Sequence, residues 1–174
     1  MMDLKLFKLI NRLSGRFSPV DQLMILISNR VRYAYLLIIV LMLFKNRFNK
    51  RIALETGIAI IISFFSHFFI HIFYLKPRPF IKRRVGILIP SKRDSSFPSK
   101  HTMLAFAAST TIFMFHRTLG TIMMWMSALT GFSRVWVGHH YPSDIIGSAL
   151  LGSLTSLVAR IISFSKFGNK PEAS

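Results

Sequence analysis

The sequence predicts an all-α protein, a polytopic membrane helix bundle of about five transmembrane helices preceded by an amphipathic helix. Two observations favour this fold class: 52% of the 174 residues are hydrophobic, and the mean hydropathy is +0.47. Both are high for a water-soluble domain. A third observation is that several apolar runs approach the ~20 residues that a helix needs to cross the hydrocarbon core.

The first 17 residues, MMDLKLFKLINRLSGRF, alternate apolar and basic side chains at helical spacing and are too polar to cross a bilayer. This pattern is typical of a helix that lies on the membrane surface. We therefore divide the chain into an N-terminal amphipathic surface helix (residues 1–17), a membrane-embedded domain (residues 18–163) and a cytoplasmic tail (residues 164–174).

Apolar runs predict the membrane spans. Three runs are long enough by themselves, namely residues 52–73, 118–137 and 145–162. A further run, residues 102–115, crosses only if its first helical turn begins near Ser99. With one more span near the N-terminus the count is five, and four or six are the alternatives.

That remaining span contains polar residues. Its apolar part, residues 36–44, is short, so the helix is expected to begin near Asp21. It would then carry Asn29, Arg30 and Arg32 inside the membrane, which favours a broken or partly interfacial helix.

The loops give an orientation, because short cytoplasmic loops are enriched in lysine and arginine. The loop 45–51, KNRFNKR, has four basic residues in seven and indicates the cytoplasmic side. The loops 76–100 and 138–143 then lie outside. The outer loop 76–100 nevertheless contains eight lysines and arginines against one acid. Either the topology is inverted, or this charge is kept there to bind an anion.

The net charge of the chain is +17, which implies an anionic partner or an anionic membrane face. Nucleic acid is disfavoured as that partner, because the charge lies in short loops between apolar runs rather than on a basic helix or an aromatic sheet. The chain has no cysteine, which excludes disulfides, thiolate metal sites and a cysteine nucleophile.

Three polar side chains within the expected span 52–73 have ordinary structural explanations. Glu55 follows Arg51 by four residues, the spacing of an ion pair on a helix. His67 and His71 are one turn apart and could bind a metal ion. No third ligand is obvious, so a polar seam between helices is the favoured interpretation.

The segment SRVWVGHHYPSD, residues 133–144, gathers titratable groups between apolar runs. His140 and Asp144 are four residues apart, and Pro142 stands where proline favours the first turn of a helix. The Asp144 carboxylate is therefore expected to reach one nitrogen of His140. A carboxylate behind an imidazole fixes its tautomer and suits a nucleophilic or basic histidine. Arg134 adds a planar fork that matches phosphate oxygens.

Two further clusters are expected on the same membrane face. In FPSKH, Ser99 and Lys100 stand at a helix start, where backbone N–H groups can hold a phosphate, and His101 can act as a general acid. In KPRPF, Arg78 stands between two prolines. Three such clusters on one side of the bilayer predict an anion-binding site.

The order of these residues resembles the three-part signature of the type 2 phosphatidic acid phosphatase superfamily. Residues 78–79 (RP) correspond to the first part, residues 98–101 (PSKH) to the second and residues 133–144 to the third. In its small size and in the runs SFPSKHT and GFSRVWVGHHYPSD, the chain is also similar to the bacterial undecaprenyl pyrophosphate phosphatases of the bacitracin-resistance type. The resemblance extends from about residue 17 to residue 162.

This resemblance implies that residues 18–163 form a phosphatase domain, and it implies a role for each motif residue. His140 is the implied nucleophile, Asp144 orients it, and His101 protonates the leaving group. No metal and no cofactor is implied. The implied ligands of the phosphate group are Arg78, Ser99, Lys100 and Arg134, with Lys100 contributing its backbone N–H.

The resemblance also implies the reaction, which is hydrolysis of undecaprenyl pyrophosphate to undecaprenyl phosphate through a phosphohistidine intermediate. This activity would recycle the cell-wall lipid carrier at the extracytoplasmic face of the plasma membrane and confer bacitracin resistance. The implied partners are the polyprenyl pyrophosphate lipid and the bilayer. A phosphatase of phosphatidic acid or phosphatidylglycerophosphate is the alternative enzyme, and a transporter or resistance permease is the alternative of another class.

Two positions depart from the family's pattern. The family has a lysine seven residues before the arginine of the first part, where this chain has His71. The corresponding phosphate contact is lost, made by a protonated His71, or replaced by another residue such as Lys76. The third residue of the second part is commonly glycine and here is Lys100, whose ammonium is expected to reach the second phosphate of a diphosphate.

Overall fold

The computed structural model describes residues 2–82, 86–90 and 94–167. Within these residues the chain is helical, apart from its turns and one isolated antiparallel bridge between Pro77 and Ser95. The helices are α1 (Met2–Asn11), α2 (Ser18–Lys45), α3 (Arg47–Phe73), α4 (Pro79–Lys82), α5 (Lys100–Phe115), α6 (Arg117–Trp136) and α7 (Pro142–Phe167). The predicted all-α class is confirmed.

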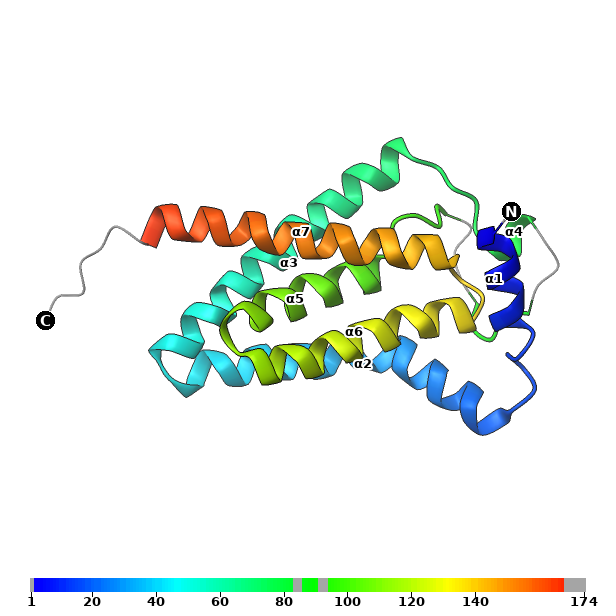
Figure 1. Cartoon of the computed structure of the whole chain (residues 1–174), viewed down its shortest axis with the longest axis horizontal. Coiled ribbons are helices and arrows are strands. Elements are labelled where there is room, and N and C mark those ends of the chain that lie inside the picture. Colours follow the sequence, from blue (N-terminus) through cyan, green and yellow to red (C-terminus); the bar gives the residue numbers. More distant parts are fainter. Residues whose placement is uncertain (1, 83–85, 91–93, 168–174) are drawn as a thin grey trace, which may run out of the picture.

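Helix α5 is the centre of the bundle and packs against α3, α6 and α7, while α2 packs mainly against α3 and α6. Figure 1 shows α1, α4 and the beginning of α7 together at one end of the molecule. The α2–α3 and α5–α6 turns lie at the other end. We call these the α4 end and the opposite end. Alternating helix directions thus bring the connections 74–99 and 137–141 to the α4 end.

Small residues allow α5 to approach its neighbours closely. Ala105, Ala107 and Ala108 are buried on this helix. Gly152 of α7 stands where a Cβ atom would overlap the carbonyl oxygen of Met103. Close backbone approach through small residues is typical of helix packing in membranes. A larger side chain at position 152 would push α7 away from α5.

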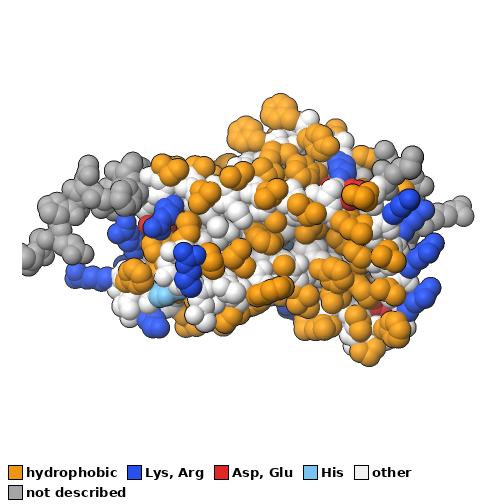
Figure 2. Space-filling view, viewed as in Figure 1, with side chains coloured by type: hydrophobic (Ala, Val, Ile, Leu, Met, Phe, Trp, Pro, Cys, Tyr) orange, Lys and Arg blue, Asp and Glu red, His pale blue; other side chains and the backbone are white. Residues whose placement is uncertain are grey.

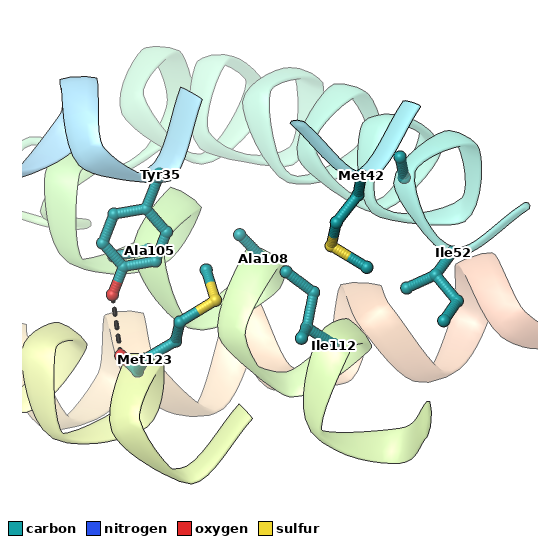
Figure 3. Close-up of a cluster of buried hydrophobic side chains, with 8 residues drawn as sticks. Tyr35, Met42, Ile52, Ala105, Ala108, Ile112 and Met123 are labelled. Atoms are coloured by element: carbon teal, nitrogen blue, oxygen red, sulfur yellow. Dashed lines mark hydrogen bonds between the residues drawn. The ribbon is translucent and has the colours of Figure 1, made fainter. Parts of the chain in front are cut away.

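A buried hydrophobic cluster joins α2, α3, α5 and α6 (Figure 3). Tyr35 of α2 lies within it, and its hydroxyl donates a hydrogen bond to the backbone carbonyl of Met123 at 2.7 Å. The same hydroxyl is 2.7 Å from Oγ of Ser127. A buried phenol with such partners is satisfied, so this contact fixes α2 against α6.

The exposed surface is that of a membrane protein. Among the described helices, three are long and apolar enough to cross a bilayer: Ser18–Lys45, Arg47–Phe73 and Pro142–Ser163. Figure 2 shows hydrophobic side chains over the middle of the molecule and lysines and arginines toward its two ends. The chain is therefore a multi-pass membrane protein. Of the five predicted spans, those assigned to α5 and α6 do not meet the same length and composition criteria.

The helix boundaries bear on two expectations. For α2 we predicted a broken or a partly interfacial helix; it runs without interruption from Ser18 to Lys45, so the first of these alternatives was wrong. The predicted tail, residues 164–174, overlaps the end of α7 up to Phe167 and otherwise lies outside the described residues.

Helix α1 docks on the α4 end of the bundle. Phe7 is fully buried, and its ring centroid lies 5.6 Å from that of Tyr141, with Val135 in the same cluster. The Asp3 carboxylate accepts hydrogen bonds from the backbone N–H of Ser143 at 3.0 Å and from its hydroxyl at 2.6 Å. The predicted surface helix therefore also contacts the first turn of α7.

Candidate active site

Three segments that are distant in the sequence meet at the α4 end. Arg78 directs its Nη1 atom to the backbone carbonyl of His139 at 3.3 Å and to Nε2 of His140 at 3.5 Å. Arg134 comes from the last turn of α6, and its charge also acts on His140. The predicted convergence of the first and third motif clusters is confirmed.

A glycine shapes the turn that presents His140. Gly138 has a φ of +86°, a conformation that favours glycine. A Cβ atom there would also meet the carbonyl oxygen of Gly86. The carbonyl of Arg134 accepts hydrogen bonds from the backbone N–H groups of His139 and His140 at 3.0 and 3.3 Å. This tight reversal after α6 directs His140 inward, where it is buried.

The hydrogen bonds of His140 define its tautomer. Its Nδ1 atom lies 2.6 Å from the backbone carbonyl oxygen of Ser96. Because a carbonyl oxygen can only accept, Nδ1 carries the proton, and in the neutral ring the lone pair is on Nε2, 3.5 Å from Nη1 of Arg78. The nitrogen beside Arg78 is therefore the one with the lone pair that a nucleophilic histidine needs.

Electrostatics keep this ring neutral. Burial lowers the pKa of His140 well below its ordinary value of 6.5, and the positive charges of Arg134 and Arg78 lower it further, against the opposing effect of the Ser96 carbonyl. At neutral pH the ring is unprotonated. A nucleophilic histidine requires this form.

The adjacent His139 has a structural contact instead. Its Nε2 atom is 2.8 Å from the backbone carbonyl of Ile89, and its ring packs edge-on against Phe80. Burial, followed by the charge of Arg134, lowers its pKa to about 4. These contacts are with groups other than the Asp144 carboxylate.

The expected contact between Asp144 and His140 was wrong. The fully buried Asp144 carboxylate accepts hydrogen bonds from Nζ of Lys76 at 2.6 Å, from the backbone N–H of Tyr141 at 2.9 Å and from the hydroxyl of Ser96. Among the described residues, no hydrogen bond joins it to His140. The reason is that α7 begins at Pro142, so His140 precedes the helix and the four-residue spacing does not bring the two side chains together.

Ser96 connects the two groups indirectly. Its hydroxyl donates to Asp144 and its carbonyl accepts from Nδ1 of His140. The negative charge of Asp144 thus fixes the serine, and the serine fixes the tautomer and orientation of the ring. Sequence reasoning missed Ser96, and the run SSFPSKH contains no spacing signal that would have found it.

Lys76 and His71 were the candidates to replace the family's missing lysine. Nζ of Lys76 is 2.6 Å from Asp144 and 3.6 Å from Asp3. Burial acts to lower the pKa of Lys76, but the hydrogen bond and charge of Asp144, with the charge of Asp3, outweigh it and raise the pKa. His71 approaches Asp94 at 3.9 Å. Both side chains therefore face carboxylates in this structure.

The second motif cluster begins α5. Ser99 is fully buried; its backbone N–H donates to Oγ of Ser148 at 2.7 Å, and its hydroxyl is 3.0 Å from that of Thr102. If Thr102 donates in this pair, the Ser99 hydroxyl keeps its own proton for a phosphate oxygen. Lys100 is exposed, and its ammonium lies 4.6 Å from the ring centroid of Phe64.

His101 faces a different space from His140. It lines a cavity of about 320 Å³ together with Lys100 and Arg32. No hydrogen bond among the described residues joins His101 to His140. The charge of Arg134 acts on both imidazole rings.

The described residues do not bring together the side chains that a metal site needs. Within residues 2–82, 86–90 and 94–167, no three His, Asp or Glu side chains cluster in a way that could hold a metal ion. His67 and His71 stack with ring centroids 5.4 Å apart. Positive charge near His140 comes instead from Arg78 and Arg134.

Comparison with known proteins identifies relatives over nearly the whole chain. A sequence model of the PAP2 superfamily matches residues 52–167. The chain is 39% identical to the undecaprenyl-diphosphatase BcrC of Bacillus subtilis (strain 168), over 86% of this chain and 78% of the relative. It is 29% identical to the bacitracin transport permease protein BcrC of Bacillus licheniformis, over 90% of this chain and 78% of that one.

A solved structure agrees with the fold. The crystal structure of Aquifex aeolicus LpxE superposes with a TM-score of 0.77 at 26% identity, covering 92% of this chain and 96% of that chain. The superfamily match spans well over half of the chain and contains all three motif clusters. On these grounds the chain belongs to the PAP2 superfamily.

Proposed function

We propose that this membrane protein hydrolyses undecaprenyl diphosphate to undecaprenyl phosphate and inorganic phosphate. The observation that carries the proposal is the buried, neutral His140, whose free Nε2 faces Arg78 and is close to the charge of Arg134. The substrate is supported by the relative at 39% identity, which is an undecaprenyl-diphosphatase.

In the first step, Nε2 of His140 attacks the terminal phosphorus in line with the bond to the bridging oxygen. A P–N bond forms and the P–O bond to the lipid phosphate breaks. Arg78 and Arg134 stabilise the negative charge on the equatorial oxygens, and such preorganised electrostatics are the main contribution to phosphoryl-transfer catalysis. The negative charge of the bound diphosphate favours the protonated form of His101, and His101 gives this proton to the departing lipid phosphate.

In the second step, neutral His101 takes a proton from water as the water oxygen attacks the phosphohistidine. A P–O bond forms, the P–N bond breaks with its electron pair returning to Nε2 of His140, and phosphate leaves. Between the two steps the ring of His140 carries positive charge. Asp144 holds Ser96 in place, and the Ser96 carbonyl oxygen accepts a hydrogen bond from the Nδ1–H group in both steps. This hydrogen bond stabilises the positive charge on the ring. Asp144 is thus a positioning residue that acts through Ser96.

We further propose that the active site faces the extracytoplasmic side. The basic loop 45–51 lies at the opposite end of the bundle, and short loops of this composition favour the cytoplasm. Because the chain has no cysteine, single cysteines can report the topology. In intact cells, an impermeant thiol reagent should label Arg16→Cys but not Lys50→Cys; the reverse result would invert the topology.

A substrate panel tests the reaction. Protein purified in detergent should release phosphate from undecaprenyl diphosphate with a higher kcat/KM than from phosphatidic acid or phosphatidylglycerophosphate. A higher value for either of the last two would favour the alternative enzyme. The permease named among the relatives suggests the other class. Absence of phosphate release in detergent, together with bacitracin movement across proteoliposomes, would favour transport.

A further inference from the structure

The cavity lined by His101 combines apolar walls with a few polar groups. It lies between α2, α3, α5 and α6 and has a volume of about 320 Å³. Its polar lining consists mainly of Ser28, Arg32, Lys100 and His101. Apolar walls with a small number of convergent polar groups are the usual form of a ligand site.

The lining residues of α2 are ordered along the helix. Ser28 accepts a hydrogen bond from Nη1 of Arg134 at 2.6 Å, so it lies beside the phosphate site. Arg32 follows four residues later on the same face, one helical turn or about 5.4 Å further from the α4 end. Leu36 and Ile39 continue the same wall of the cavity. Along α2 from the α4 end, the phosphate site is therefore followed first by the Arg32 cation and then by an apolar wall.

Arg32 has no structural partner that explains its charge. It lies inside Ser18–Lys45, a helix long and apolar enough to cross the membrane, where charged side chains are costly and usually functional. Its guanidinium donates to the hydroxyl of Tyr33 at 3.2 Å and lies over that ring at 5.0 Å. None of the ion pairs among the described residues includes Arg32. Tyr33 therefore holds the cation without neutralising it.

The surrounding charges are positive as well. The charge of Arg32 acts on Arg134 and on the ring of His101, and Lys100 adds to the field at His101. Arg134 is buried, and its Nε atom has no hydrogen-bond partner. Positive charges that gather at one cavity and beside it, without a counter-ion on Arg32 among the described residues, favour the binding of an anion.

We propose that Arg32 binds the phosphate that stays on the lipid, while Arg78 and Arg134 hold the phosphate that is transferred to His140. The first part of the lipid tail then lies against Leu36 of the same helix. His101 lines the cavity beside Arg32, where the bridging oxygen would leave. This inference rests on the proposed function and deepens it, because it assigns α2 the recognition of a diphosphate headgroup.

A preference for the diphosphate over the monophosphate follows from the positions that each headgroup fills. A lipid monophosphate fills only the position between Arg78 and Arg134, and leaves Arg32 without an anion. A lipid diphosphate occupies both positions. Arg32 therefore contributes to transition-state binding of the diphosphate and little to that of the monophosphate.

The experiment compares kcat/KM for a polyprenyl diphosphate and for the monophosphate of the same polyprenol. Arg32→Gln should lower the diphosphate value by about 10- to 150-fold, the range expected for a lost charge-assisted hydrogen bond, and the monophosphate value much less. Arg30 and Arg32 are both exposed on α2, but only Arg32 lines the cavity, so Arg30→Gln is the matched control and should leave both values unchanged. Arg32→Lys should restore part of the loss.

The ratio of the two kcat/KM values does not depend on the fraction of folded enzyme, so partial unfolding of a variant does not affect the test. If the wild-type protein hydrolyses the diphosphate and Arg32→Gln leaves the ratio unchanged, this inference is wrong while the proposed function stands. An equal change of the ratio in Arg30→Gln would also overturn it. If the wild-type protein releases phosphate only from the monophosphate, the proposed function and this inference both fail.

Discussion

Asp144 at the α4 end and Glu55 at the opposite end are both buried carboxylates, and they are held in different ways. At the α4 end, Asp144 is contacted by three donors, two of which come from the connection after α3. At the opposite end, Glu55 pairs with Arg51 on its own helix at 3.3 Å and accepts a hydrogen bond from Ser163 at 2.8 Å. One oxygen of Glu55 is buried without a partner.

Asp144 is a charge that positions other groups of the site, whereas Glu55 forms an ion pair with a structural role. The contacts of Asp144 tie together Lys76, Ser96 and the start of α7, and through Ser96 they reach His140. The contacts of Glu55 join α3 to α7 far from the α4 end. We therefore expect catalysis to be sensitive to changes at the α4 end and insensitive to changes at the opposite end.

The largest effect is expected at His140. His140→Ala removes the proposed nucleophile, and loss of a nucleophile costs several orders of magnitude in kcat. The variant should remain in the membrane and keep the melting temperature of the wild-type protein to within a few degrees. Phosphate release from purified protein provides the measurement. Activity within tenfold of the wild type would contradict the assignment of His140 as nucleophile.

A smaller effect is expected for the two carboxylates, and it differs between them. Asp144→Asn weakens the charged hydrogen bond to Ser96 and should lower kcat by about 10- to 100-fold, since such bonds contribute about 1.5–3 kcal/mol. KM should change little, because Asp144 does not touch the substrate.

Glu55→Gln is the matched control and should leave kcat within about twofold. Both variants are compared by steady-state kinetics and by thermal unfolding in detergent. Equal losses of kcat in the two variants would remove the distinction between the two ends.

The pH dependence is expected to shift with the charge of Arg78. Burial and the charges of Arg134 and Arg78 lower the pKa of His140 well below 6.5. The ring is therefore still neutral at pH 6.5, and the acid limb of the kcat/KM profile lies below that pH. Arg78→Gln removes one positive neighbour, raises this pKa and moves the limb to higher pH. Arg78→Lys keeps the charge and should keep the limb near its wild-type position. The substrate ionises identically in all assays, so a difference between variants reports the enzyme.

The smallest effect is expected for Asp3, at the edge of the site. Its carboxylate accepts a hydrogen bond from the backbone N–H of Ser143 and so caps the start of α7. Loss of a helix cap lowers the free energy of unfolding by about 0.5–2 kcal/mol. Asp3→Ala should therefore lower the melting temperature while leaving kcat within a few-fold of the wild type. Loss of activity as large as that of Asp144→Asn would instead place α1 within the catalytic machinery.

The features that the sequence predicted well depend on local spacing. Apolar runs located the long helices, and the four-residue separation of Arg51 and Glu55 predicted their ion pair, which is confirmed at 3.3 Å. The same reasoning failed for His140 and Asp144, because it assumed a helix over both residues and α7 begins only at Pro142.

The features that the sequence did not predict depend on long-range packing. Ser96 and Asp144 are 48 residues apart, and Asp3 and Ser143 are 140 residues apart. No periodicity in the sequence links such positions. Arg32 had a visible signal, a charge within an apolar segment, but this charge indicated a broken or partly interfacial helix. In the structure the helix is continuous and the charge faces a cavity.

The position of Arg32 also bears on how substrate preference is inherited. The segment that matches the superfamily begins at residue 52, so α2 lies outside it, whereas His140 and its partners lie within. On our proposal, the helix that recognises the headgroup is separate from the residues that carry out phosphoryl transfer, so one can change without altering the other. A chimera in which residues 18–45 come from a relative with another lipid substrate should keep its turnover mechanism and acquire the donor's headgroup preference.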